Sequence, residues 1–261
     1  MTLTEALRAA YDQVGETWND GPARVYRALA QPVLDAAGDV AGKDVVDVGT
    51  GSGVLADELV RRGARVTGLD LSHGMLLRSR EERPPAVVAD VRALPLRDGA
   101  VDVVTAAFVL NHLEAPVAGV RELARVVRHG GTVLATTFEG EAPHPAKPVI
   151  EAVAAGYGHQ LPDWYQAVKS GTMQLLSTPD LFETAAGEAG LASARVERVE
   201  VSLDLTPSEL VAWRFGMAQL APFVAGLGPR EREALVTDAE HAVAGLTDPV
   251  QMAVLLLVVE V

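Results

Sequence analysis

Residues 45–56, VVDVGTGSGVLA, place three glycines at alternate positions between an apolar strand and a helix. Gly49, Gly51 and Gly53 lack a Cβ, so the backbone of this turn can approach a ligand closely. The helix that follows begins with N–H groups that have no partner inside the helix and that favour polar or anionic ligand groups. The turn therefore predicts a cofactor site at the carboxyl end of the first strand.

The spacing of these glycines separates two classes of cofactor. A dinucleotide-binding turn has glycine at its first, third and sixth positions, but the sixth position counted from Gly49 is Val54. The pattern here is Asp-x-Gly-x-Gly-x-Gly, with Asp47 two residues before the first glycine. This pattern resembles the cofactor loop of the class I S-adenosylmethionine-dependent methyltransferases, and it is most similar to the small-molecule branch that includes ubiquinone and menaquinone biosynthesis enzymes.

Later segments resemble motifs of the same family in the same order. Residues 65–70 are expected to form a second buried strand that ends in Asp70, whose carboxylate can accept both ribose hydroxyls. Nicotinamide cofactors use an acid in the same way, so Asp70 alone does not discriminate. The next residues, DLSHGML, look like the family segment in which Ser72 caps a helix and Met75 offers a flexible thioether to adenine. In residues 87–95, VVADVRALP, the resemblance implies that Asp90 accepts the adenine amino group.

The remaining pattern predicts an α/β fold. Residues 101–108 and 132–138 are expected to be the fourth and fifth strands, joined by a helix over 117–128 and a turn at 129–131. The family usually has proline where His129 precedes the glycine pair, a small departure. A helix from a Thr178 cap to about Gly190, an exposed strand over 194–203 near the sheet edge and a final strand over 250–261 follow. The resemblance implies a Rossmann-like sheet of seven strands, mostly parallel, with the last strand antiparallel between the fifth and sixth and with helices on both faces.

We expect one domain over residues 1–261. Within it, residues 1–39 form an N-terminal helical cap, 40–138 the cofactor-binding core, 139–177 and 206–246 two helical lid insertions, and 250–261 the final strand. The net charge of −13 argues against a nucleic-acid substrate and an anionic membrane surface. The chain has no cysteine, shows no secretory signal pattern and has no apolar run long enough to span a bilayer, so we expect a cytoplasmic protein. The oligomeric state does not follow from the sequence.

The resemblance assigns the cofactor, S-adenosylmethionine, to a set of residues around the strand ends. This set comprises Tyr11, Trp18, Asp47, Gly49, Thr50, Gly51, Gly53, Asp70, Leu71, Met75, Asp90, Val91 and Phe108. Tyr11 belongs to a Tyr-Asp segment resembling one that closes over the methionine end of the cofactor, where its hydroxyl could bind the carboxylate. An amphipathic helix that merely covers the sheet is an equal reading. Arg24 is a further candidate for that carboxylate or for an acidic acceptor.

Two long insertions leave the expected carboxyl edge of the sheet, where ligands of open α/β sheets bind. The first contains His144, Tyr157, His159, Trp164, Tyr165 and Met173, and the second contains Trp213, Phe215, Met217 and Phe223. An aromatic lid of this kind suits a small, largely apolar or aromatic acceptor. The other reading is that Leu210, Trp213, Met217 and Leu220 form one helical stripe that packs the lid onto the core.

His112 follows the fourth strand and is the candidate general base, although a histidine here can also serve only to fix the turn. The predicted function is methyl transfer to a small organic molecule by in-line displacement, and we expect no metal. Residues 110–113, LNHL, lack the Asp/Asn-Pro-Pro-Tyr pattern of nucleic-acid base methyltransferases. Two other readings stay open: a methyltransferase-like enzyme, such as a cyclase, that does not transfer the methyl group, and a non-catalytic protein with a relic fold.

Overall fold

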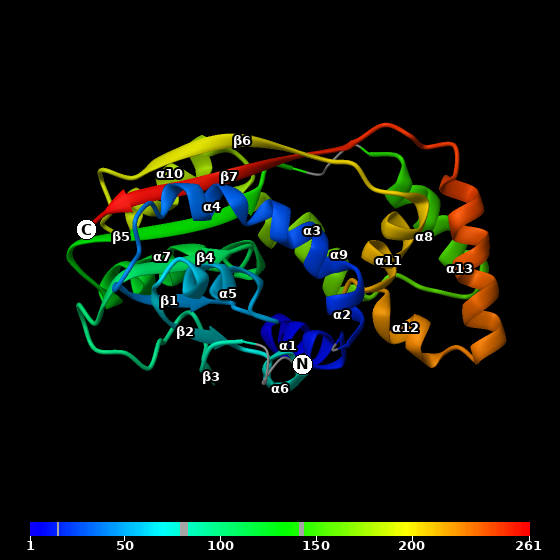
Figure 1. Cartoon of the computed structure of the whole chain (residues 1–261), viewed down its shortest axis with the longest axis horizontal. Coiled ribbons are helices and arrows are strands. Elements are labelled where there is room, and N and C mark those ends of the chain that lie inside the picture. The colour runs from blue at the N-terminus through cyan, green and yellow to red at the C-terminus, as the bar shows by residue number, and fades with distance from the viewer. Residues whose placement is uncertain (15, 79–82, 141–143) are drawn as a thin grey trace.

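A computed structural model of the chain describes residues 1–14, 16–78, 83–140 and 144–261 (Figure 1). Seven strands form one sheet in the order β3-β2-β1-β4-β5-β7-β6. The strands are β1 (Asp44–Val48), β2 (Arg65–Asp70), β3 (Ala86–Val88), β4 (Val101–Ala107), β5 (Val127–Phe138), β6 (Arg195–Leu203) and β7 (Val250–Glu260). β7 is antiparallel to both of its neighbours, β5 and β6, and the other paired strands are parallel. This is the predicted Rossmann-like sheet, with β6 at its edge.

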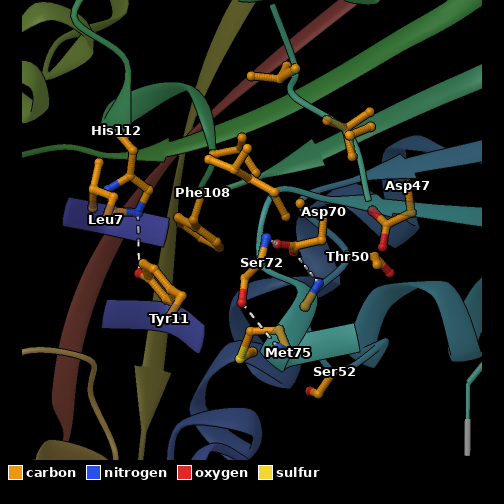
Figure 2. A pocket seen from close by; sticks show the side chains of 18 of the residues that line it. Leu7, Tyr11, Asp47, Thr50, Ser52, Asp70, Ser72, Met75, Phe108 and His112 are labelled. Carbon is orange, nitrogen blue, oxygen red and sulfur yellow. Dashed lines mark hydrogen bonds between the residues drawn. The ribbon is translucent and has the colours of Figure 1, made fainter. Parts of the chain in front are cut away.

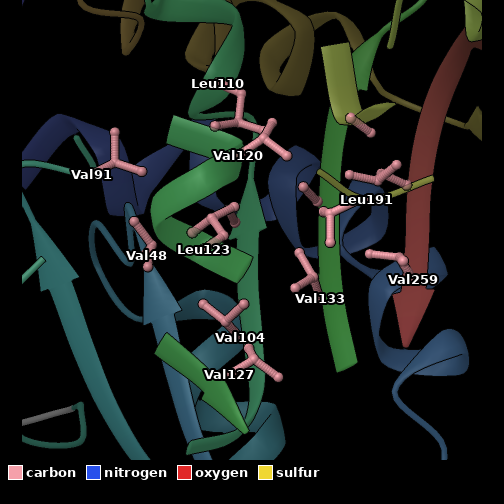
Figure 3. Packing of buried hydrophobic residues seen from close by; sticks show 14 of the residues in the cluster. Val48, Val91, Val104, Leu110, Val120, Leu123, Val127, Val133, Leu191 and Val259 are labelled. Carbon is pink, nitrogen blue, oxygen red and sulfur yellow. The ribbon is translucent and has the colours of Figure 1, made fainter. Parts of the chain in front are cut away.

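Alternate residues of the central strands face opposite sides of the sheet, because successive side chains of a strand point to opposite faces. Val45, Val103 and Leu134 pack against α4 (Gln31–Ala36) and α5 (Val54–Arg61) on one face. Their neighbours Val46, Val104 and Val133 pack against α7 (Pro116–Val126) and α10 (Pro179–Glu188) on the other face (Figure 3). Both faces are buried, which explains why these strands read as nearly continuous apolar runs.

Four helices precede the first strand: α1 (Leu3–Val14), α2 (Glu16–Asp20), α3 (Pro22–Leu29) and α4. The short helix α6 (His73–Arg78) follows β2 and packs against α1. Gly74 makes this contact possible, because a Cβ there would lie 2.3 Å from the backbone oxygen of Asp12. The N-terminal cap is therefore seated directly on the segment that follows β2.

Several local predictions are confirmed. Thr178 accepts a hydrogen bond from the backbone N–H of Leu181 at the start of α10, and Thr206 and Glu209 form a capping box at α11 (Pro207–Phe215). Ser72 accepts a hydrogen bond from the Met75 N–H at 3.1 Å and so caps α6.

The predicted turn at residues 129–131 is wrong. β5 already begins at Val127, and Gly130, with φ of +77°, lies inside this strand. The pairing of β4 with β5 shifts register between Val101 and Val103, which accommodates the extra residues as an irregularity of the ladder. The helix consequently ends at Val126, two residues before its expected end at 128.

The two insertions form helices beyond the carboxyl ends of the parallel strands, at the right of Figure 1. The first, which includes the undescribed residues 141–143, contains α8 (Ala146–Gly156), α9 (Asp163–Ser170) and the 3-10 helix η2 (Thr172–Leu176). The second contains α11, α12 (Ala221–Gly226) and α13 (Pro229–Val243). Ile150 of α8, Leu210 of α11 and Leu235 of α13 share one buried cluster with β7, so the insertions form a packed layer.

Candidate functional site

A cavity of about 190 Å³ lies at the carboxyl ends of β1, β2 and β4 (Figure 2). We call it the first cavity. It is lined by the predicted cofactor residues Tyr11, Trp18, Asp47, Gly49, Thr50, Gly51, Asp70, Leu71, Met75, Asp90, Val91 and Phe108, and by His112. Gly53 is the exception and does not belong to the lining. The structure therefore brings residues from positions 11 to 112 of the chain around one space.

The three glycines of the turn have different reasons to be glycine, although all have positive φ. A Cβ on Gly49 would lie 2.0 Å from a methyl group of Val109, so this glycine lets the turn pack against the segment after β4. A Cβ on Gly53 would lie 2.7 Å from Cβ of Arg83, and Gly53 also starts α5 in a left-handed conformation at φ +90°. A Cβ on Gly51 would meet the Met75 methyl at 3.3 Å, on the wall of the cavity. Only Gly49 and Gly51 face the ligand space.

Asp70 fixes the shape of the turn as well as facing the cavity. Its carboxylate accepts hydrogen bonds from the backbone N–H groups of Gly51 and Ser72, both at 2.8 Å. Burial raises the pKa of Asp70, and these two backbone donors oppose the shift. The side chain is thus held rigidly at the end of β2, where a ligand hydroxyl can reach it.

Asp47 is a buried carboxylate with one oxygen left unpaired. The Thr105 hydroxyl donates to its Oδ1 at 2.7 Å, while Oδ2 has no hydrogen-bond partner in the described part of the chain. Burial raises the pKa of Asp47 to about 6, and the Thr105 hydrogen bond opposes that rise. A cationic or hydrogen-bond-donating ligand group in the first cavity would satisfy this carboxylate.

Asp90 is paired within its own loop. Arg92 binds both carboxylate oxygens, with Nη2 to Oδ2 at 2.6 Å and Nε to Oδ1 at 3.0 Å. This pairing lowers the pKa of Asp90 and keeps it ionised. Both residues line the first cavity, so a ligand amino group would approach an already paired carboxylate.

His112 and Tyr11 form the wall opposite the glycine turn. The Tyr11 hydroxyl and His112 Nε2 are hydrogen-bonded at 3.4 Å, and the rings meet edge to face (Figure 2). The other ring nitrogen, Nδ1, is shielded from solvent and has no partner among the described residues. Burial lowers the pKa of His112 to about 4, so the imidazole is neutral at physiological pH.

The next residue of the N-terminal segment, Asp12, holds α1 in place. Its Oδ1 accepts hydrogen bonds from the Ser72 hydroxyl at 2.7 Å and the Gly74 N–H at 2.8 Å. Both donors belong to the segment that carries Met75. The sequence analysis missed this role, although the Tyr-Asp pair had marked the segment.

A second cavity, of about 120 Å³, adjoins the first beneath the two insertions. Its lining comes from both lids and includes His144, Lys147, Trp164, Tyr165, Val168, Met173, Trp213, Arg214, Met217 and Gln219. Four residues line both cavities: Tyr11, Tyr26, Phe108 and His112. Phe108 is the only non-glycine residue with positive φ, +58°, in the described chain, and it stacks on Phe138 with 4.4 Å between ring centroids. A strained backbone held by packing thus lies where the two cavities meet.

The predicted lid residues divide between lining and support. Tyr157 donates a hydrogen bond to Asp238 at 2.6 Å, and His159 packs edge to face on Phe223, away from the second cavity. Phe215 is buried in the core cluster of the lid. Trp213 and Met217 both line the cavity and pack with the lid cluster. The packing reading is confirmed for Leu210, Trp213 and Leu220, but α11 ends at Phe215, so Met217 and Leu220 do not continue one helical stripe.

The polar residues that line the cavities differ in part from those predicted. Arg24 lines neither cavity and instead pairs with Glu209 at the surface. Arg214, Gln219 and Asn111, which the sequence analysis did not single out, line the second cavity and are each at most 4% exposed. Arg214 stands between Trp213 and Phe215 in a largely apolar helix, and these apolar neighbours were the available sequence signal for its burial.

A sequence model described as "Methyltransferase domain" matches residues 46–135, which run from β1 to β5. The demethylmenaquinone methyltransferase of Corynebacterium glutamicum (strain R) is 30% identical over 183 residues, covering 70% of this chain and 76% of that protein. The chain belongs to the class I S-adenosylmethionine-dependent methyltransferase family.

Two further likenesses agree with this family. The demethylmenaquinone methyltransferase of Corynebacterium kroppenstedtii is 33% identical over 155 residues, which cover 59% of this chain and 65% of that protein. The chain thus spans less than two thirds of the length of that relative. A methyltransferase structure from an antibiotic biosynthesis pathway of Anabaena variabilis superposes with a TM-score of 0.61 at 15% identity, covering 87% of this chain and 95% of the other, which shows the shared methyltransferase fold.

No three His, Asp or Glu side chains in the described ranges gather closely enough to hold a metal ion. Among the helices of the described chain, none combines the length and the apolar composition that crossing a bilayer requires.

Proposed function

We propose that this protein is a methyltransferase that uses S-adenosylmethionine to methylate a small, largely apolar or aromatic organic molecule. The observation that carries the proposal is the pair of adjoining cavities. One is bounded by the glycine turn and the carboxylates of a nucleoside site, the other by aromatic side chains of both lids, and four residues line both. A donor and an acceptor can therefore meet without either leaving its own cavity.

The first cavity fits the proposed cofactor. Asp70 stands ready for the ribose hydroxyls, Asp90 for the adenine amino group and Met75 for the adenine face. The Oδ2 atom of Asp47, which has no partner in the described residues, fits the charged amino-acid end of the cofactor. Tyr11 lines the same cavity from the wall opposite the glycine turn, beside His112. When bound, the cofactor supplies an electrophilic methyl group on a sulfonium.

The contribution of the protein is position and exclusion of water. Holding acceptor and donor in near-attack geometry supplies about 7–11 kcal/mol of the barrier reduction. Tyr26, Phe108 and Phe138 form an aromatic wall at the junction, with Tyr26 and Phe108 edge to face at 5.5 Å. His112 lies at this junction as the candidate base, but its pKa of about 4 makes it a weaker base than a free imidazole. It can therefore assist only an acceptor hydroxyl that is itself acidic, such as a phenol.

The acceptor class follows from the lining and from the relatives. Relatives of this chain carry the name demethylmenaquinone methyltransferase, and a flat, quinone-type ring suits a cavity walled by Trp164, Tyr165 and Trp213. The seven Phe, Tyr and Trp side chains of the second cavity favour a small molecule over a protein side chain or a nucleic acid.

Isotopically labelled S-adenosylmethionine tests the proposal. We expect the purified protein to bind this cofactor and its demethylated product in calorimetry, and neither NAD nor NADP. Incubation with extract of the native host should then label a small molecule detectable by mass spectrometry. Absence of cofactor binding would contradict the proposal. Cofactor binding with consumption of a small molecule but no methylated product would instead support an enzyme that retains the cofactor without transferring its methyl group.

A further inference from the structure

Arg214 is a charged side chain buried in the lid. It lies in α11, is 4% exposed and lines the second cavity. Its Nη2 donates to Oε1 of Glu151 in α8 at 3.0 Å, and its Nε–H is buried with no partner among the described residues. The guanidinium also lies over the Trp213 ring, with Cζ 5.3 Å from the ring centroid. A guanidinium carries five N–H donors, so one ion pair and one ring contact leave most of its hydrogen-bonding capacity unused.

Glu151 compensates the charge only from one side. Its side chain is 27% exposed, compared with 5% for Arg214, so the carboxylate keeps part of its hydration. None of the described residues that line the second cavity is Asp or Glu, whereas Lys147 and His144 line it together with Arg214. Lys147 and Arg214 are therefore the charged residues of the described lining, and both are basic.

Two more buried donors accompany Arg214. The side-chain Nε2 of Gln219 and the indole Nε1 of Trp213 are shielded from solvent and find no acceptor in the described part of the chain. Both residues line the same cavity, and Gln219 is 4% exposed. Buried polar groups of folded proteins nearly always have partners, so unpaired donors that line a cavity indicate the ligand that completes them.

We propose that the acceptor of the second cavity carries a carboxylate, which binds Arg214 with help from Gln219. The inference rests on the proposed function and narrows the acceptor to an aromatic or apolar carboxylic acid. Its ring lies among the aromatic side chains of the lids, and its acidic group lies at the α11 side. A planar guanidinium is well suited to a planar carboxylate because its parallel N–H groups match the two oxygens.

Paired probes of equal shape test the acidic group without any methyl transfer. The probes are 2-naphthoate and its neutral counterpart 2-naphthamide, titrated into the full chain by calorimetry at neutral pH, with and without S-adenosylhomocysteine. We expect the wild type to bind naphthoate about ten-fold or more tightly than naphthamide, the scale of a hydrogen bond to a charged group. Equal affinities, or no binding of either probe at millimolar concentration, would overturn the proposal.

The proposal predicts that substitutions of the two ion-pair partners change naphthoate affinity in opposite directions. Arg214→Gln should abolish the preference for naphthoate, while Glu151→Gln should strengthen naphthoate binding because the arginine loses its internal partner. If Arg214 serves only to join α11 to α8, both variants instead lower the thermal stability and leave the preference for naphthoate unchanged, which would overturn the proposal. Glu151→Gln/Arg214→Gln, in which both charges are gone, is the matched control and should bind the two probes equally.

The proposal can still be tested if Arg214→Gln does not fold or if the protein does not transfer methyl groups. Should Arg214→Gln fail to fold, Glu151→Gln and Gln219→Leu decide the question, since the latter should weaken naphthoate more than naphthamide. Failure of the methyl-transfer function would appear separately, as absence of S-adenosylmethionine binding in a protein that still prefers naphthoate.

Discussion

The hydroxyl of Tyr11 and Nε2 of His112 lie 3.4 Å apart and join the N-terminal helix to the segment after β4. Both side chains line both cavities, so this pair forms part of the boundary between them. Tyr11 comes from α1 and His112 from the 3-10 helix η1 (Leu110–His112). A contact between residues 101 positions apart thus sets the place where donor and acceptor would meet.

Replacement of His112 distinguishes a base from a scaffold. If the imidazole accepts the proton of the acceptor, His112→Gln should lower the methyl-transfer rate about 10²–10⁴-fold while folding and cofactor affinity stay nearly constant. Single-turnover rates with the acceptor found by isotope labelling provide the measurement. Tyr11→Phe, which keeps the ring and loses the hydroxyl, is the matched control for the hydrogen bond. A His112→Gln variant that melts earlier but turns over normally would show that the histidine only supports the turn.

The pH dependence of stability should contain two opposing contributions. Burial lowers the pKa of His112 from 6.5 to about 4, so between these values the unfolded chain binds a proton that the folded chain does not, and stability falls on acidification. Burial raises the pKa of Asp47 from 3.8 to about 6, so the folded chain binds the proton first and stability rises on acidification. Each shift corresponds to about 3 kcal/mol.

The two contributions nearly cancel between about pH 4 and 6, and single variants should reveal them. Relative to wild type, His112→Gln should gain stability as the pH falls from 6.5 to 4, and Asp47→Asn should lose it as the pH falls from 6 to 4. Denaturant unfolding at several pH values measures both slopes. Parallel pH profiles for wild type and both variants would show that neither group is titrated as its burial implies.

Asp12 should contribute to stability and to cofactor binding through one oxygen. Asp12→Ala removes the acceptor of the Ser72 hydroxyl and the Gly74 N–H, and we expect a loss of about 1–3 kcal/mol in the free energy of unfolding. Asp12→Asn keeps a side-chain oxygen at this place and should lose less. Chemical denaturation, together with calorimetry of S-adenosylmethionine, gives both quantities. A full loss in both variants would indicate that the charge matters more than the hydrogen bonds.

Asp70→Ala should weaken S-adenosylmethionine binding by about 1.5–3 kcal/mol, or roughly 10- to 150-fold. The carboxylate also ties Gly51 to Ser72, so a melting curve must show that the turn is still formed. Gly51→Val should weaken binding further, because its side chain would lie on the wall beside Met75 at a positive φ that valine rarely adopts. Unchanged affinity in both variants would contradict the assignment of the first cavity.

A bulky side chain in the second cavity should stop methyl transfer without weakening cofactor binding in the first. Met173 lines the second cavity, and Met173→Trp should occupy part of its volume and stop methyl transfer, with cofactor affinity within an order of magnitude of wild type. Leu175 lies two residues away, is 43% exposed and does not line the cavity, so Leu175→Trp is the matched control. Full activity in a folded Met173→Trp protein would exclude this space as the acceptor site.

The sequence predicted the first cavity better than the second for a physical reason. The turn from Asp47 to Gly53 and the carboxylates Asp70 and Asp90 follow consecutive strands, so parallel pairing alone brings them together. The motif did not predict the role of Gly53. This glycine allows the start of α5 and leaves room for Arg83, and it does not line the first cavity. The Gly-Gly pair predicted a turn before β5. In the structure these glycines lie inside β5, which begins at Val127 because the strand already pairs there.

The second cavity depends on packing between distant segments. Arg214 is buried because α11 packs against α8, and its partner Glu151 is 63 residues away. The apolar neighbours Trp213 and Phe215 suggest burial, but the sequence does not show that Glu151 is the partner or that a cavity lies beside the guanidinium. Trp164, Met173 and Trp213 were recognised from composition. Which lid side chains face inward depends on how α9 packs against η2 and α1 and how α11 packs against α3.

The helix α1 forms part of the wall of both cavities. This helix contributes Leu7 and Tyr11 to the first cavity, and Tyr11 also belongs to the second. Any displacement of α1 that widens the exit for a spent nucleoside therefore removes part of the wall beside the neighbouring ligand. If α1 moves during product release, the same motion would therefore admit solvent to the second cavity, and a helix that moved too early would expose the acceptor to water before methyl transfer.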